Sequence, residues 1–186
     1  MGLNSAMFMA ADAPLLSFVE TADQQRFRFL LDEGDFVGLV TLSDLQRLPV
    51  YALLFGLVIA VEMLLMEQIR KACGTTPDAW LVKLNVNQRE TIERQWKDAM
   101  RRNVAIDRLS CASFGQEIQA AIGLGLFVKD DETHRRLFAL KALRDQVCHA
   151  SEFAPTSEHA LEIPARVRDA RALANLLQDG LEAQPK

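Results

Sequence analysis

The segment 140–150, with the sequence LKALRDQVCHA, contains the side chains best suited to chemistry in this chain. The guanidinium of Arg144 can hold an anion, and the imidazole of His149 can exchange a proton near neutral pH. Asp145 lies four residues before His149, so in a helix its carboxylate can hydrogen-bond one imidazole nitrogen and raise the basicity of the ring. These three residues predict a site that binds an anion and transfers a proton.

A purely structural interpretation of the same residues stays open. In it, His149 stabilises the C-terminal end of a helix through the helix dipole, and Arg144 keeps its charge at the surface over a buried stem. Arg144 and His149 are five residues apart in the sequence, which is about 140° around a straight helix. Their side chains therefore converge only if the helix frays near His149, or if a second subunit brings its own copy.

An apolar stripe accompanies these polar residues at helical spacing. It consists of Leu137, Leu140, Leu143 and Val147. Arg144 lies in or beside this stripe, where a guanidinium must reach water, a carboxylate or an anionic ligand. Far upstream, Glu62 has apolar helical neighbours, and a buried carboxylate is stabilised by pairing with an arginine. We expect Glu62 to be a buried structural partner of Arg144; alternatively, it lies at the edge of its own stripe and reaches water.

The elements that position these residues change character at Pro49. Before it, aromatic and branched residues flank the acidic turn 32–35, whose Gly34 can adopt a positive φ, and this pattern predicts a β-hairpin between short helices at 17–25 and 44–48. After it, apolar periodicity and capping signals predict helices alone. Their expected ranges are 49–71, 87–102, 110–122, 131–150 and 164–178. The predicted fold class is mainly α, an up-and-down helical bundle with a small N-terminal α/β appendage.

The composition is that of a globular protein with a substantial core. The 186 residues are 49% hydrophobic and 25% charged, which excludes a disordered chain, a collagen-like fibre and a disulfide scaffold. The net charge is −4, so no overall basic field attracts nucleic acid, although the run 134–144 has four bases and no acid. Three widely separated cysteines without metal-ligand spacing indicate reduced thiols, and we expect neither a metal nor a cofactor.

One stretch resembles a membrane segment, namely 50–66, which is interrupted only by Glu62. A spanning helix needs about 20 apolar residues, and a carboxylate deep in the bilayer is costly. We therefore expect a buried core helix in a soluble, cytoplasmic protein without a signal peptide or a membrane contact. Because this helix is apolar around most of its circumference, one bundle cannot cover it, and we expect it to form the interface of a homodimer.

The residues from Arg144 to His149 resemble the R-x4-H motif of the HEPN superfamily, including the polar residue directly after the arginine. As in that family, they lie late in a long helix of an all-α bundle, and the resemblance covers roughly residues 50–180. It implies an antiparallel bundle that dimerises, with the two motif copies facing each other across the two-fold axis. Many such proteins are metal-independent endoribonucleases, whereas others are inactive and bind nucleotides or partner proteins.

The resemblance also implies a role for each residue of the motif. His149 would transfer the proton, Arg144 would hold the scissile phosphate, and Asp145 would orient them. The 2′-OH of the RNA substrate would be the nucleophile, which explains why the chain needs neither a serine or cysteine nucleophile nor a metal cluster.

A second resemblance lies near the N-terminus. The sequence GLVTLSD, from Gly38 to Asp44, is similar to the G-h-h-T-x-x-D motif that closes a CBS module, where h is an apolar residue. The helix–hairpin–helix order of 17–48 agrees with such a module. The resemblance implies that Thr41 and Asp44 contact the phosphate and ribose of adenine nucleotides, in a site usually built between two modules. The alternative is that both residues form a structural cap where the strand turns into a helix.

These patterns predict three parts and two functions. The parts are a loose leader at 1–16, a partial CBS-like module at 17–48 and a HEPN-like helical bundle at 49–182. The expected function is metal-independent RNA cleavage by a homodimer with a composite site, as a toxin or stress effector. The alternative is a non-catalytic regulatory module that senses adenine nucleotides or mediates assembly.

Overall fold

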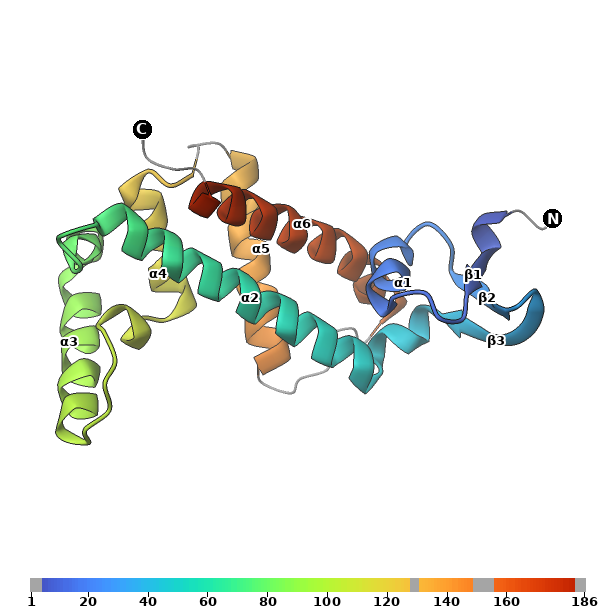
Figure 1. Cartoon of the computed structure of the whole chain (residues 1–186), viewed down its shortest axis with the longest axis horizontal. Helices are drawn as coiled ribbons and strands as arrows, with labels where there is room; N and C mark the ends of the chain where they lie inside the picture. The colour runs from blue at the N-terminus through green and yellow to red at the C-terminus, as the bar shows by residue number, and fades with distance from the viewer. Residues whose placement is uncertain (1–4, 128–130, 149–155, 183–186) are drawn as a thin grey trace. The chain divides into compact units, whose positions relative to one another are not determined.

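A computed structural model of the chain describes residues 5–127, 131–148 and 156–182. The described residues are mainly helical, with a small three-stranded sheet near the N-terminus (Figure 1). The predicted fold class, a mainly α helical bundle with a small α/β appendage, is confirmed. The strands are β1 (Phe8–Ala10), β2 (Phe27–Asp32) and β3 (Asp35–Thr41), and the helices are α1 (Leu15–Thr21), α2 (Leu48–Cys73), α3 (Val86–Arg101), α4 (Phe114–Leu124), α5 (Asp131–Cys148) and α6 (Ser157–Glu182).

The chain divides into two compact units, each made of two separate stretches of sequence. The first unit comprises Met1–Val58 and Ala142–Ala172, and the second comprises Ile59–Lys141 and Leu173–Lys186. The long helices α2, α5 and α6 contribute residues to both units. The N-terminal sheet therefore belongs to the same unit as the end of α5 and the first part of α6.

The sheet of the first unit has the strand order β1-β2-β3. β1 runs parallel to β2, and β3 runs antiparallel to β2 with an irregularity in the pairing between Leu30 and Leu31. Glu33 and Gly34, with φ angles of 49° and 96°, close the hairpin, as the acidic turn predicts. β1 itself lies among residues expected to be a loose leader. Three residues are too few to show a strand pattern, and β1 owes its conformation to pairing with β2.

Ion pairs connect α6 to the end of α1 within the first unit. The Arg168 guanidinium donates to both carboxylate oxygens of Asp23 at 3.1 and 2.7 Å, and Arg171 donates to Glu20 at 2.5 Å. The hydrogen bond from Arg168 lowers the pKa of Asp23 below its usual value. The apolar core of this unit is drawn from all its helices and includes Phe18, Val19, Leu54, Leu143, Val147, Ile163 and Val167.

Capping residues bound the helices of the second unit. Asn85 and Gln88 exchange side-chain and backbone hydrogen bonds of 2.9 Å at the start of α3. Ser113 and Gln116 form the same capping box at the start of α4, and Gly125, with φ 77°, ends it. The predicted helix at 110–122 therefore starts later, because Ser113 is the cap. The buried core of this unit includes Trp80, Ile92, Phe114 and Ile118.

α6 is longer than the sequence predicts. The pattern places Pro164 in the first turn, yet the helix begins at Ser157 and Pro164 lies inside it. Proline has no N–H to donate, so the helix loses one hydrogen bond there. The Pro164 ring is buried, which offsets part of this cost.

A bidentate ion pair holds the loop after α3 to α2 in the second unit. Arg70 donates to the two carboxylate oxygens of Asp107 at 2.8 and 3.2 Å, and Asp107 also accepts from the backbone and hydroxyl of Ser110 at 2.9 and 2.6 Å. The hydrogen bond from Arg70 is the main cause that lowers the pKa of Asp107 from 3.8 to about 2.

We expect this pair to make stability depend on pH in the acid range. Because the folded-state pKa of Asp107 is depressed, its contribution is full above about pH 4 and is lost as the pH falls toward 2. Both side chains are nearly half exposed, so after solvent screening the contribution is about 1 kcal/mol. Urea unfolding should show Asp107→Asn less stable by that amount at pH 6, with the difference shrinking toward zero as the pH falls through 2.

The matched control is Asp98→Asn, which breaks an exposed pair with Arg101 three residues away. This variant should differ little from wild type at either pH. A deficit of Asp107→Asn that is the same at pH 6 and pH 2 would contradict the assignment.

Candidate functional site

The end of α5 carries the residues that the sequence singles out. All four members of its apolar stripe are buried, which confirms the predicted periodicity: Leu137, Leu140, Leu143 and Val147. The buried side of the helix therefore fixes the orientation of the polar residues between them. α5 ends at Cys148, so His149 is the next residue in the chain, and it lies outside the described residues.

Arg144 and Asp145 lie side by side at this helix end. The closest approach of their charged groups is 3.5 Å, and the side chain of Arg144 is 32% exposed. The guanidinium is thus half-buried beside the apolar stripe, as its position in the sequence predicts. A guanidinium that is partly open to solvent can be approached by a phosphate.

Two residues that the sequence analysis missed adjoin the same helix end. Tyr51, at the start of α2, donates its hydroxyl hydrogen to the backbone carbonyl of Val147. Arg166, on α6, donates to Gln146 at 2.9 Å and to Glu162 at 2.7 Å. The spacing of Glu162 and Arg166 signals a helical ion pair, but no local pattern connects Arg166 to Gln146 or Tyr51 to Val147.

These contacts give the helix end a defined polar surround within the first unit. Tyr51 satisfies one of the last carbonyl groups of α5, which a helix otherwise leaves without a partner. Arg166 adds a second guanidinium beside Gln146, the residue two positions after Arg144. The site thus combines two arginines with carboxylates and a phenol, and its guanidinium groups are suited to holding an anion.

Glu62, the expected partner of Arg144, is half-buried on α2. It belongs to the second unit, whereas Arg144 belongs to the first. Its pairing with Arg144 stays a prediction.

Thr41 and Asp44 lie where β3 passes into the 3₁₀ helix Leu42–Gln46. The carboxylate of Asp44 accepts from the backbone N–H of Thr41 at 2.8 Å and from its hydroxyl at 3.0 Å. Arg47 also approaches this carboxylate at 2.6 Å. These contacts are the structural cap named as the alternative to nucleotide binding, so a ribose hydroxyl would have to share the Asp44 carboxylate with Thr41 and Arg47.

The positive charge of the run 134–144 is partly neutralised by Glu132, which precedes the run. Glu132 binds Arg135 at 2.8 Å and Arg136 at 2.9 Å, and the hydrogen bond from Arg135 lowers the pKa of Glu132 to about 2. His134 is half-buried, and its Nε2 is buried without a hydrogen-bond partner among the described residues. In the described part of the chain, no group of three or more His, Cys, Asp or Glu side chains could hold a metal ion.

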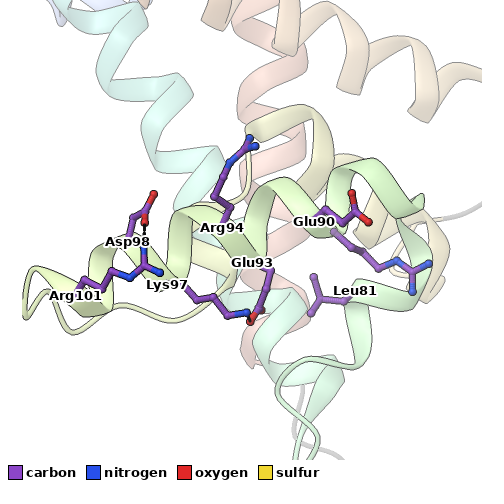
Figure 2. A pocket seen from close by; sticks show the side chains of 8 residues that line it. Leu81, Glu90, Glu93, Arg94, Lys97, Asp98 and Arg101 are labelled. Carbon is purple, nitrogen blue, oxygen red and sulfur yellow. Dashed lines mark hydrogen bonds and ion pairs between the residues drawn. The ribbon is translucent and has the colours of Figure 1, made fainter.

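A groove of about 490 Å³ runs along α3 in the second unit (Figure 2). Its lining is mixed in charge and consists of Leu81, Arg89, Glu90, Glu93, Arg94, Lys97, Asp98 and Arg101. Several of these charges neutralise one another: Asp98 pairs with Arg101 at 2.9 Å and Glu93 with Lys97 at 3.3 Å. The groove contains none of the residues singled out by the sequence and has no nucleophile paired with a base.

One face of α2 is open. By length and composition alone, α2 is the one helix of the described residues that could cross a membrane, and 28% of its apolar window is buried. A buried stripe runs along it at helical spacing: Val50, Leu54, Val58, Val61, Leu65 and Ile69. α2 is therefore buried along this stripe, whereas Phe55 and Met63 are exposed, and the expectation of a buried core helix stays a prediction.

The arrangement at the end of α5 can bind an anion through Arg144, with Asp145 and Gln146 to fix the neighbouring groups. The polar groups near this helix end come from α2, α5 and α6. Among the described residues, they do not form a set of ligands that could hold a metal ion. No family model, no curated protein and no solved structure matches this chain.

Proposed function

We propose that this protein is a metal-independent endoribonuclease of the HEPN type that acts as a homodimer in the cytoplasm. The observation that carries the proposal is the position of Arg144. It is half-buried at the C-terminal end of α5, 3.5 Å from Asp145, and partly open to solvent. His149 is the next residue after α5 in the sequence, and the proposal assigns it the proton transfer.

In the proposed reaction, the 2′-OH of the RNA attacks the adjacent phosphorus. The P–O2′ bond forms while the P–O5′ bond breaks, the proton of the 2′-OH passes to His149, and the leaving 5′ oxygen takes up a proton from water. Arg144 stabilises the charge that develops on the phosphate oxygens, and Asp145 orients the two groups. The products are a 2′,3′-cyclic phosphate and a 5′-hydroxyl.

The spacing of the motif and the exposed face of α2 support the proposed homodimer. Arg144 and His149 diverge by about 140° on one straight helix, and a second motif copy removes this difficulty. The exposed side of α2 carries Phe55, Gly56 and Met63, and a Cβ added at Gly56 would meet nothing within 4 Å. A glycine inside a helix costs about 1 kcal/mol relative to alanine, and packing within the chain does not require one at this position. A partner helix packed closely against α2 would require it.

The function is tested by incubating the purified chain with a labelled RNA in excess EDTA. We expect cleavage at an undiminished rate, with products that end in a 2′,3′-cyclic phosphate. Conversion of these ends by a cyclic phosphodiesterase identifies them. Cleavage that disappears on chelation would assign the activity to a metal site, and intact RNA would leave the protein without this function.

The order of strands and helix in the N-terminal sheet favours a second candidate function. This candidate is a module that senses adenine nucleotides or mediates assembly. A CBS module begins with a strand before its helix and hairpin, and the order β1, α1, β2, β3 has that strand. Thr41 and Asp44 would contact the nucleotide, and a second chain would supply the other half of the site. Because the Asp44 carboxylate is already engaged, calorimetry with AMP or ATP should find weak binding at most if RNA cleavage is the function.

A further inference from the structure

One face of the N-terminal sheet is covered and the other is open. On the covered side, Arg28 is 5% exposed and donates to the carbonyl of Thr21 at the end of α1, at 2.8 Å. Because neighbours in register share a face and side chains alternate along a strand, the opposite side carries a different set of residues. We name this set the aromatic face: Phe8, Phe27, Phe29, Leu31, Phe36 and Leu39.

The aromatic face is a connected cluster centred on Phe29. The ring of Phe29 lies 5.7 Å from that of Phe8, 5.5 Å from that of Phe27 and 5.6 Å from that of Phe36, measured between centroids. The cluster is nevertheless open to solvent, since Phe36 is 63%, Leu39 50% and Phe8 37% exposed. Single exposed apolar residues are ordinary, but a contiguous aromatic cluster marks an interaction surface.

Charges lie at the two ends of the hairpin that carries this face. Asp32, Glu33 and Asp35, all exposed, surround the turn, and the exposed Arg26 lies just before β2 at the other end. The two ends are about 20 Å apart at the rise of a strand. If two copies stacked with their hairpins parallel, six carboxylates would meet. A two-fold axis that lies between the two faces and runs across the strands reverses one copy, so that each acidic turn faces the other copy's Arg26.

We propose that the aromatic face binds the same face of a second copy of this chain, in an aligned sheet-on-sheet packing with the two hairpins antiparallel. An isologous contact needs a surface that is complementary to itself under a two-fold rotation. The apolar centre of the face is complementary to itself. The negative charges at one end of the hairpin are complementary to the positive charge at the other end. The inference does not depend on RNA cleavage and goes beyond the dimer proposed for α2.

The size of the face sets the strength of this association. At about 200 Å² for an aromatic side chain, its exposed parts amount to roughly 400 Å² per copy. Stable interfaces bury about 800 Å² per partner, so this contact alone is weak and depends on concentration. A chain that also pairs through α2 has two different isologous surfaces and forms assemblies larger than a dimer.

Sedimentation equilibrium of the full chain tests the proposal. Between roughly 1 and 100 µM, the mean mass of the wild type should double. The Phe36→Asp variant should not show this doubling. The side chain of Phe36 is mostly exposed, so the variant should fold, which circular dichroism checks. The matched control is Phe138→Asp, since Phe138 is 58% exposed on α5 and lies outside the aromatic face; its mass should follow that of the wild type.

A charge exchange distinguishes a second copy from a foreign basic partner. Arg26→Glu should weaken the doubling step, and adding Asp35→Arg should restore it, because the two new charges face each other across the two-fold axis. A foreign partner would not give this rescue. A mass that is the same in wild type and Phe36→Asp at every concentration would overturn the proposal. RNA cleavage that persists in Phe36→Asp shows that the two proposals are separate.

Discussion

His149→Ala is expected to lower the rate of RNA cleavage by about 10²–10⁴, with RNA affinity and fold largely unchanged. An imidazole is suited to exchanging a proton near neutral pH. The substitution leaves the residues of the buried stripe of α5, from Leu137 to Val147, unchanged. Single-turnover cleavage in EDTA separates the chemical step from binding.

His159→Ala is the matched control for this variant. His159 is exposed, and its ring nitrogen lies 2.8 Å from the hydroxyl of Thr156, away from the arginine motif in the sequence. Its removal should leave cleavage unchanged, and added imidazole should restore part of the activity of His149→Ala alone. A wild-type rate in His149→Ala would end the catalytic interpretation.

Arg144→Lys is expected to lower cleavage by about 10²-fold or more, although the charge is retained. A guanidinium presents a planar fork of donors to a phosphate, whereas an ammonium is a point charge that cannot reproduce this geometry. The loss should appear in kcat more than in KM, because the contact strengthens as charge develops on the phosphate. Arg136→Lys is the control on the same helix, where the partner is Glu132 and a lysine can keep the ion pair.

Mixing two inactive variants tests whether the site is shared between subunits. If Arg144 of one subunit acts with His149 of the other, a heterodimer of Arg144→Ala and His149→Ala contains one intact site. Random exchange of subunits should then restore roughly a quarter of the wild-type activity. No recovery after exchange, with each homodimer inactive, would place both residues of each site on one chain and require the end of α5 to fray.

The sequence predicts those parts of the fold that depend on local signals. Gly34 closes the hairpin, and Gly74, with a positive φ, directly follows the end of α2. Ile92, Trp96 and Met100 predict α3 by their spacing, yet Ile92 alone of the three is buried. Trp96 is instead covered by the guanidinium of Arg108, 3.8 Å from the ring centroid, and this contact from a loop has no local signature.

The candidate site shows the same division. The spacing of its leucines correctly places Arg144 beside the buried stripe of α5. The contacts of Tyr51 with Val147 and of Arg166 with Gln146 join residues that are far apart in the sequence. Such contacts depend on how helices pack, and neither residue type nor periodicity within one helix specifies them.

The composition of the first unit has a consequence for synthesis of the chain. Its sheet and the start of α2 lie within the first 58 residues, but the rest of the unit extends to residue 172, more than a hundred residues later. At ribosomal rates of about 5–20 residues per second, the two parts emerge roughly 5–20 s apart. During that interval, the aromatic hairpin and the open N-terminal half of α2 remain without their partner segments on the ribosome. The exposed apolar side chains of the hairpin, such as Phe36, are then accessible to chaperones while the rest of the unit is still being synthesised.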